Sequence, residues 1–299
     1  MSKDATGAEI NAIKQFKDDI EAGLELDFRS HAPRWRDIKS KYLDTAFRNI
    51  VEYIKGIFGI IVFLLLWEVC SRFGIIDNIF IPPFSKICTE FWNLMKSGEL
   101  GYHTSISLWR TMTGLGLGIA VAVPLGLLVG QIHIVERFLD PILQTFRQTS
   151  TLALMPVFIL LLGLGETSKV AMIFWGVSWP ILLSTISGVK SVDPLFIKAA
   201  KSMNESMSGI FLKIILPASL PHIFTGIRLG ATSSIMLLIV AEMVGASSGL
   251  GFLIHDFEVK YEIPKMFAVI ALFSILGLSL NYILVVAEKK IIKWKPNEA

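Results

Sequence analysis

Long apolar runs separated by short polar stretches dominate the chain after residue 50. Each run is about 20 residues long, which is enough for a helix to cross the ~30 Å hydrocarbon core of a bilayer. The runs fall near residues 51–73, 106–131, 147–164, 168–190, 220–244 and 266–287. This pattern predicts an all-α membrane protein with six transmembrane helices.

The stretch from Asp193 to Pro217 is a polar and helical interruption deep within this apolar sequence. Asp193 followed by Pro194 is typical of a helix start, because the Asp side chain can accept from free N–H groups and proline fits the first turn. Ser206 can cap a second short helix, which Pro217 is expected to end. We interpret this helix pair as a docking element for a partner outside the bilayer.

The first 50 residues differ from the rest of the chain. Residues 1–33 are charged and mixed in sign, and from Trp35 to Ile54 apolar residues recur every three or four positions between Arg and Lys. The second pattern is typical of an amphipathic helix in the membrane interface, although an ordinary surface helix would show it too. We therefore expect a cytoplasmic extension over 1–50, a transmembrane domain over 51–290 and a cytoplasmic tail over 291–299.

The composition agrees with a polytopic membrane protein, since 53% of the 299 residues are apolar and 18% are charged. The net charge of +3 is too small to indicate nucleic acid binding. Cys70 and Cys88 alone indicate no disulfide framework. The first apolar run begins too late for a cleavable signal peptide, so we expect a retained first span.

The positions of lysine and arginine predict the orientation of the spans. The N-terminal segment is rich in both residues, and Lys289 and Lys290 follow the last span. Both ends are therefore expected in the cytoplasm, which requires an even number of spans. The loop Val135–Arg147 and the stretch Asp193–Pro217 are then cytoplasmic, whereas the loops after the first and fifth spans face outward.

The second expected span carries a small residue at every fourth position, namely Gly114, Gly118, Ala122, Gly126 and Gly130. Such a stripe allows another helix to approach closely, either within the subunit, which we favour, or across a subunit interface. Proline also interrupts three spans, at Pro124, Pro156 and Pro180. Such breaks can line a cavity or a moving gate, or can be simple kinks.

Charged residues inside the spans have alternative interpretations. Glu68 and Arg72 are four residues apart, so we expect a structural ion pair. Arg228 could extend back to the cytoplasmic interface. Glu242 follows an apolar run and precedes a glycine-rich stretch. An ionisable group there indicates either a functional role or an anchor for the outer loop.

Hydroxyl side chains cluster in two of the expected spans. The clusters are Thr149, Ser150 and Thr151, and Thr232, Ser233 and Ser234. Together with Glu242 they are candidates for a pathway or gate. Hydrogen bonding between helices would explain the hydroxyl groups about equally well.

No residue constellation typical of an enzyme occurs in the sequence. There is no HExxH, no GxSxG and no Cys/His cluster with metal-ligand spacing. Gly165–Lys169 superficially suggests a phosphate loop but lacks the Gly-Lys-Ser/Thr pattern. We therefore expect no catalytic, cofactor or metal site in this chain. If ATP drives the protein, another chain carries the ATPase.

The stretch Asp193–Pro217 resembles the cytoplasmic EAA loop of permease subunits of bacterial ABC importers. Lys198-Ala199-Ala200 matches the Glu-Ala-Ala of that motif, and Ile214-Ile215-Leu216-Pro217 matches its Ile-x-Leu-Pro with the same spacing. Two positions differ, because Lys198 replaces the usual Glu and Asn204 replaces the usual Gly. Asn is the next-best residue for a left-handed backbone, so we expect the turn to be kept.

The resemblance extends over about residues 60–290, to the nitrate/sulfonate/taurine/bicarbonate branch of these permeases. Matching stretches include Ile81-Pro82-Pro83-Phe84-Ser85, Ser107-Leu108-Trp109-Arg110 and Ala241-Glu242-Met243. The family usually has proline near Gln148–Ser150, where this chain has none. The extension before residue 34 is not typical of the branch.

The resemblance implies the fold of a type I ABC importer permease in the bacterial inner membrane. It also implies a second copy of the chain, two cytoplasmic ATPase subunits that hold ATP and Mg²⁺, and an extracytoplasmic substrate-binding protein. The cargo would be a small anionic solute such as nitrate, a sulfonate, taurine or bicarbonate. The expected ATPase-coupling residues are Lys198, Ala199, Ala200, Met203, Asn204 and Glu205.

Other functions stay open at this point. The importer could carry an aromatic acid or a vitamin precursor, and the sequence shows no cluster of arginines for an anion. An ion-gradient-driven secondary transporter with Glu242 as proton carrier predicts inverted repeats, which the sequence does not show. A membrane anchor without a transport role would leave the proline breaks and the stretch Asp193–Pro217 unexplained.

Overall fold

The structure is a computed structural model that describes residues 14, 17, 18, 58–73, 77 and 80–292. The expected interfacial helix from Trp35 to Ile54, the start of the first expected span and the tail after residue 292 lie outside these ranges. The chain divides into two units, Met1–Trp67 and Glu68–Ala299. In the first unit, residues 58–67 are helical, and the rings of Phe63 and Trp67 meet edge to face at 5.9 Å.

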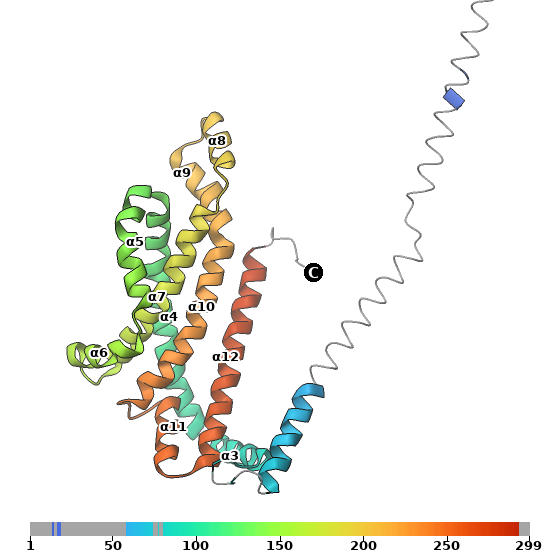
Figure 1. The fold of residues 1–299 in the computed structure, drawn as a ribbon, viewed down its shortest axis with the longest axis vertical. Coiled ribbons are helices and arrows are strands. Elements are labelled where there is room, and N and C mark those ends of the chain that lie inside the picture. The colour runs from blue at the N-terminus through green and yellow to red at the C-terminus, as the bar shows by residue number, and fades with distance from the viewer. Residues whose placement is uncertain (1–13, 15–16, 19–57, 74–76, 78–79, 293–299) are drawn as a thin grey trace, which may run out of the picture. The chain divides into compact units, whose positions relative to one another are not determined.

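The second unit is built from helices, and its described residues contain no β-strand. The helices are α3 (Phe84–Lys96), α4 (Glu99–Gln131), α5 (His133–Gln148), η1 (Leu152–Leu154), α6 (Met155–Leu162), α7 (Glu166–Lys190), α8 (Pro194–Ser202), α9 (Met207–Ile210), η2 (Phe211–Ile215), α10 (Leu216–Met243), α11 (Leu250–Val259) and α12 (Ile263–Ile291). Figure 1 shows α8 and α9 at one end of this unit and α3 and α11 at the other. The all-α prediction is confirmed.

Four helices in the described part of the chain are long and apolar enough to cross a membrane. They are α4, α7, the continuous helix Met207–Met243 and α12. The pair His133–Gln148 and Leu152–Leu162, bent by 83°, would supply a fifth span. The first expected span, residues 51–73, is described only from residue 58, where it is helical.

The third expected span, 147–164, differs most from its prediction. Residues His133–Gln148 form the amphipathic helix α5, so the predicted loop over Val135–Arg147 is wrong. The charged residues that suggested a loop recur at helical spacing and occupy one face of α5. The helix ends at Thr149, whose backbone is extended, and helical structure resumes at η1. Pro156 stands at the start of α6, after this break.

The other two prolines do not break their spans, because Pro124 lies inside continuous α4 and Pro180 inside continuous α7. Pro217 was expected to end the second short helix of the Asp193–Pro217 stretch, and this prediction is wrong. The helix continues from Met207 through Met243, with Pro217 in the first turn of α10. The π-helical turn η2 directly before it has a wider hydrogen-bond spacing than an α-helix. The helix can therefore continue although Pro217 has no N–H group to donate.

Helix α7 is the centre of the unit and packs against both α4 and α10. The predicted stripe of small residues in α4 faces α7. A Cβ atom on Gly114 would lie 2.6 Å from Ile173 Cγ2, and one on Gly126 would lie 2.7 Å from Thr185 Cβ. Only glycine allows the two backbones to approach so closely, so the stripe is used within the subunit, as we favoured.

Helix α12 lies at the periphery. Only 11% of its most apolar window is buried, compared with 44% for α7, so it leaves many apolar side chains for lipid. Arg228 of α10 and Glu288 of α12 form an ion pair with an N–O distance of 3.6 Å. Arg228 therefore has an acidic partner within the protein. The predicted ion pair of Glu68 and Arg72 is also present, at 2.6 Å.

Candidate functional site

The short helices α8 and α9 are capped as the sequence predicted. Asp193 Oδ1 accepts a hydrogen bond from Leu195 N at 2.8 Å, and Ser206 Oγ accepts one from Gly209 N at 3.1 Å. Between the helices, Asn204 adopts a φ of 60°. This left-handed conformation confirms that Asn keeps the turn at this position.

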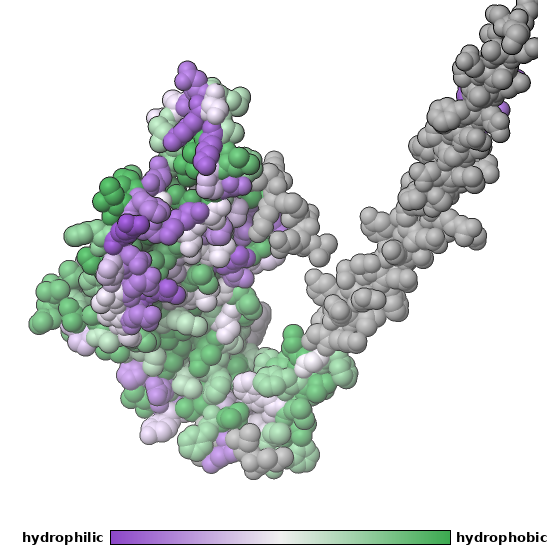
Figure 2. Space-filling model, turned by 45° about the horizontal axis from the view of Figure 1, so that its top comes forward, coloured by the Kyte–Doolittle hydropathy of each residue, from purple (hydrophilic) through white to green (hydrophobic). Residues whose placement is uncertain are grey.

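The side chains of this loop divide into an inner and an outer set. Ala200 of α8 and Ile210 of α9 are buried. Four large apolar side chains are between 62% and 82% exposed and form what we call the apolar tip: Leu195, Phe196, Met203 and Met207. Figure 2 shows hydrophilic residues next to hydrophobic ones at this end of the unit. Apolar groups in a polar loop form a surface suited to a protein partner.

The expected coupling residues all lie on this loop but face different ways. Lys198 and Ala199 are exposed, and within the described ranges Lys198 forms no ion pair. Met203 is part of the apolar tip, whereas Ala200 packs inward. Glu205 forms an ion pair with Lys213 at 3.3 Å, which braces the loop against the turn that leads into α10.

At the opposite end of α10, a buried polar network joins α4, α7 and α10. Arg110 has 1% of its side chain exposed and Glu242 has none. Arg110 Nη1 donates to Glu242 Oε1 at 2.6 Å, and Arg110 Nε and Nη2 each donate to a carboxylate oxygen of Glu166 at 2.6 Å. A buried ion pair of this kind requires good geometry, because both charges have lost their water.

The same network holds the loop between α10 and α11. Glu242 accepts hydrogen bonds from Ser107 Oγ and Gly251 N, both at 2.8 Å. Arg110 Nη1 donates to the Ser248 carbonyl at 2.7 Å, and Gly249 N donates to His103 Nδ1 at 2.9 Å. These contacts correspond to the anchoring role that was one of the two interpretations of Glu242. They leave its carboxylate enclosed by donors.

Arg110 was not singled out in the sequence as a site residue. The signal was present, because an arginine inside a long apolar helix requires an acidic partner or water. Its partners Glu166 and Glu242 come from distant parts of the chain, and the sequence contained no indication of which acids would meet it.

The hydroxyl candidates separate in the structure. Thr149, Thr151 and Ser233 line a cavity of about 550 Å³ between the α5–α6 break, α7 and α10, and we call it the polar cavity. Thr232 lines a largely apolar cavity of about 570 Å³ formed mainly by α10 and α12. Ser234 is buried and donates to the Ala231 carbonyl at 2.7 Å. Ser150 and Glu242 are among the lining residues of neither cavity.

The family described as the binding-protein-dependent transport system inner membrane component matches residues 114–293. The chain belongs to this family. This makes it a permease, a non-catalytic transport subunit of an ABC importer, with ATP hydrolysis on a separate chain. The assignment excludes a gradient-driven secondary transporter and a simple membrane anchor. It also implies an inner-membrane location, a dimeric permease, an ATPase and a substrate-binding protein as partners.

Relatives of the permease carry names of specific transport systems. This chain is 34% identical over 248 residues to SsuC of Bacillus subtilis (strain 168), which is named for aliphatic sulfonates transport. The alignment covers 83% of this chain and 90% of the relative. It is 29% identical over 238 residues to TauC of Escherichia coli (strain K12), a taurine transport system permease, covering 78% and 86%. It is 32% identical over 242 residues to CmpB of Synechocystis, a bicarbonate transport system permease, covering 77% and 85%.

Solved structures share the fold of the permease. The MetNI methionine ABC transporter in inward-facing conformations matches with a TM-score of 0.54 and 20% identity, covering 63% of this chain and 92% of that chain. An amino acid ABC transporter with histidines matches with a TM-score of 0.51 and 17% identity, covering 72% and 99%. The predicted type I ABC importer permease fold is confirmed.

Proposed function

We propose that two copies of this permease form the translocation path of an importer for a small oxyanion. One ATPase subunit docks on the α8–α9 loop of each copy, and a substrate-binding protein delivers the solute at the opposite end. Both termini and the α8–α9 loop lie in the cytoplasm. ATP and Mg²⁺ bind to the ATPase subunits, and the permease itself holds no cofactor.

The exposed apolar tip carries the ATPase-docking part of this proposal. Four large apolar side chains are exposed on the loop between the apolar helices α7 and α10, namely Leu195, Phe196, Met203 and Met207. Burial of apolar surface contributes roughly 25 cal/mol per Å², so a groove on a partner protein would stabilise this loop. Lys198 stands beside the tip and offers a positive charge where related loops have a negative one.

The relatives support the oxyanion part of the proposal. Aliphatic sulfonates, taurine and bicarbonate, for which SsuC, TauC and CmpB are named, all carry a compact oxyanion group. The similarity covers most of each relative, including the helices that surround the polar cavity. An aromatic acid or a vitamin precursor, the alternative cargo, has no named counterpart among these three relatives.

A mechanical connection between ATPase and path follows from the continuous helix Met207–Met243. Its first turns belong to the docking loop, and its last turn holds Glu242 in the buried network. ATP-driven approach of the two ATPase subunits would draw the two loops together and tilt these helices, which opens the path outward. ATP can favour that state only through contacts that differ between the inward and outward states.

The test of this proposal is reconstitution of the importer. The permease is co-expressed with its ATPase and substrate-binding protein partners, and uptake of radiolabelled taurine and ethanesulfonate into proteoliposomes is measured with and without ATP. We expect co-purification of the ATPase and ATP-dependent uptake of at least one of the two anions. Uptake without ATP, or co-purification that survives Met203→Glu unchanged, would overturn the corresponding part of the proposal.

A further inference from the structure

We infer that the polar cavity is a binding station for the oxyanion group of the transported solute, which Arg147 and His222 would hold beside the ring of Trp179. This inference rests on the proposed function and adds a site to it. The cavity has a volume of about 550 Å³, which is within the range of about 300–1,000 Å³ typical of small-molecule sites.

Two basic side chains from different helices meet in this cavity. Arg147 lies in the last turn of α5, and His222 lies in the first turns of α10. Both are exposed to the cavity, and in the part of the chain that the structure describes neither forms an ion pair or a hydrogen bond. No Asp or Glu is among the lining residues. The sequence separates the two bases, so no cluster was evident there.

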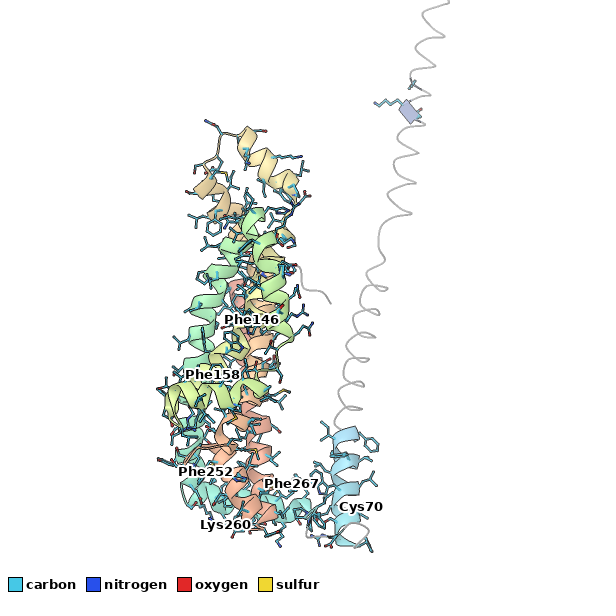
Figure 3. The ribbon with its side chains drawn as sticks, turned by 60° about the vertical axis from the view of Figure 1, so that its left-hand side comes forward. Cys70, Phe146, Phe158, Phe252, Lys260 and Phe267 are labelled. Carbon is cyan, nitrogen blue, oxygen red and sulfur yellow. The ribbon has the colours of Figure 1, made fainter. Side chains whose placement is uncertain are left out.

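Trp179 lines the cavity and is held in place by other aromatic side chains. Trp179 stacks on Phe146 with a ring-centroid distance of 5.5 Å and an interplanar angle of 15°, and Trp175 meets Trp179 edge to face at 5.1 Å. Phe158 of α6 also meets Trp175, and Figure 3 labels Phe146 and Phe158 on the two helices that flank the break. The stacking restrains the indole rings at the cavity.

The indole N–H group of Trp179 lacks a partner. Its Nε1 atom is buried and, among the described residues, forms no hydrogen bond, and the same holds for Trp175 Nε1. An indole nitrogen can only donate, and leaving a buried donor unsatisfied costs about 1–3 kcal/mol. Because this nitrogen is buried while the ring lines the cavity, Trp179 contributes an aromatic wall to the cavity and no donor.

Hydroxyl groups also line the cavity, and some of them are free to donate to a ligand. Thr149 and Ser233 donate to carbonyls of their own helices, at 3.1 and 3.0 Å. Thr151, Ser184 and Ser187 also line the cavity, and their hydroxyls have no partner within the described ranges. With Arg147 and His222, these three hydroxyl groups offer donors to several oxygens at once. A sulfonate, a carboxylate or bicarbonate matches this set, whereas a cation would meet a positive charge without a carboxylate.

The experiment measures binding of ethanesulfonate to the full-length permease in lipid nanodiscs by equilibrium dialysis with radiolabelled anion. Ethyl methyl sulfone, which has a similar shape without the charge, is the matched neutral probe. The variants are Arg147→Gln, which removes the charge, and His222→Leu, which removes the second basic group. Arg137→Gln is the control, because Arg137 is exposed on the same helix and does not line the cavity.

We expect ethanesulfonate to bind, Arg147→Gln to weaken binding at least tenfold, and His222→Leu to weaken it severalfold. Arg137→Gln should leave the affinity within twofold, and the sulfone should bind at least tenfold more weakly than the anion. Absence of ethanesulfonate binding, equal binding of the sulfone, or equal affinity of Arg147→Gln and the unmodified chain would overturn the inference.

These outcomes are separate from those of the reconstitution. Co-purification with the ATPase and ATP-dependent uptake, together with no anion binding to the permease, would reject the binding station alone. Anion binding that depends on Arg147, together with no co-purification, would reject the ATPase docking alone.

Discussion

Arg110 and Glu242 are 132 residues apart in the chain, yet their side chains form a 2.6 Å ion pair that is almost completely buried. Glu166 binds the other edge of the same guanidinium group. The three side chains therefore link α4, α7 and α10 at the end of α10 that is opposite to the α8–α9 loop. Because neither charge has access to water, each depends on the other for its stability.

Removal of the arginine should destabilise the permease strongly. Arg110→Met would leave Glu242 buried without a counter-charge, and breaking a buried pair in this way costs about 3–5 kcal/mol. We expect a clear decrease in the thermal unfolding midpoint of the detergent-solubilised protein. Arg137→Met, at an exposed position, should leave the midpoint unchanged.

The double variant Arg110→Met/Glu242→Gln should recover part of that loss, because it also removes the unpaired charge. Thermal unfolding of both single variants and of the double variant forms a double-mutant cycle. Strictly additive effects would show that the two side chains do not stabilise one another.

Two neighbouring residues of the docking loop should respond differently to the same substitution. Met203 is 82% exposed, so Met203→Glu should leave the loop folded and weaken co-purification of the ATPase at least tenfold. Ala200 is buried, so Ala200→Glu should disrupt the packing of α8 on α9 itself. Limited proteolysis distinguishes the two, with faster cleavage of the loop expected only in Ala200→Glu. Equal cleavage of both variants would contradict this assignment.

The turn at Asn204 should tolerate glycine but not a β-branched residue. Its φ of 60° lies in the left-handed region, which costs most side chains roughly 1–2 kcal/mol. Asn204→Gly should keep ATPase co-purification at the level of the unmodified chain, and Asn204→Val should reduce it. Co-purification measured side by side checks this, and full retention in Asn204→Val would show that the turn does not shape the docking loop.

The close approach of α4 and α7 predicts a difference between two glycines of the same helix. A Cβ on Gly126 would lie 2.7 Å from Thr185 Cβ, whereas one on Gly116 would meet nothing within 4 Å. Gly126→Leu should therefore destabilise the protein by at least the ~1–3 kcal/mol typical of overpacking. Gly116→Leu, which faces outward, should have little effect. The measurement is the thermal unfolding midpoint of both variants in the same detergent. Equal midpoints would contradict the close packing of α4 on α7 at Gly126.

Local and periodic features could be predicted from the sequence because they depend on neighbouring residues. The lengths of the apolar runs predicted the ends of α4, α7, α10 and α12 to within about four residues, except that α4 begins earlier than predicted, at Glu99. Capping chemistry at Asp193 and Ser206 and the backbone preference of Asn204 set the form of the docking loop. The Gly114–Gly130 stripe indicated a close helix contact within the subunit, and the structure identifies α7 as the partner helix.

The errors arose where one local signal had two structural outcomes. The charges of Val135–Arg147 suit a loop and also one face of an amphipathic helix, and the structure has the helix α5. Pro217 can end a helix or stand in its first turn, and the π-helical turn before it allows the second. Neither choice can be made without the packing of the surrounding helices.

The amino-acid sequence by itself determined the class of the protein, four of its spans, the capped helices α8 and α9 and its family, because length, periodicity and motif spacing are read along the chain. Only the tertiary structure decided which distant groups meet. The partners of Arg110 and the shared cavity of Arg147, His222 and Trp179 depend on how α4, α5, α7 and α10 pack. That packing follows from many weak contacts between helices, and no local pattern encodes it.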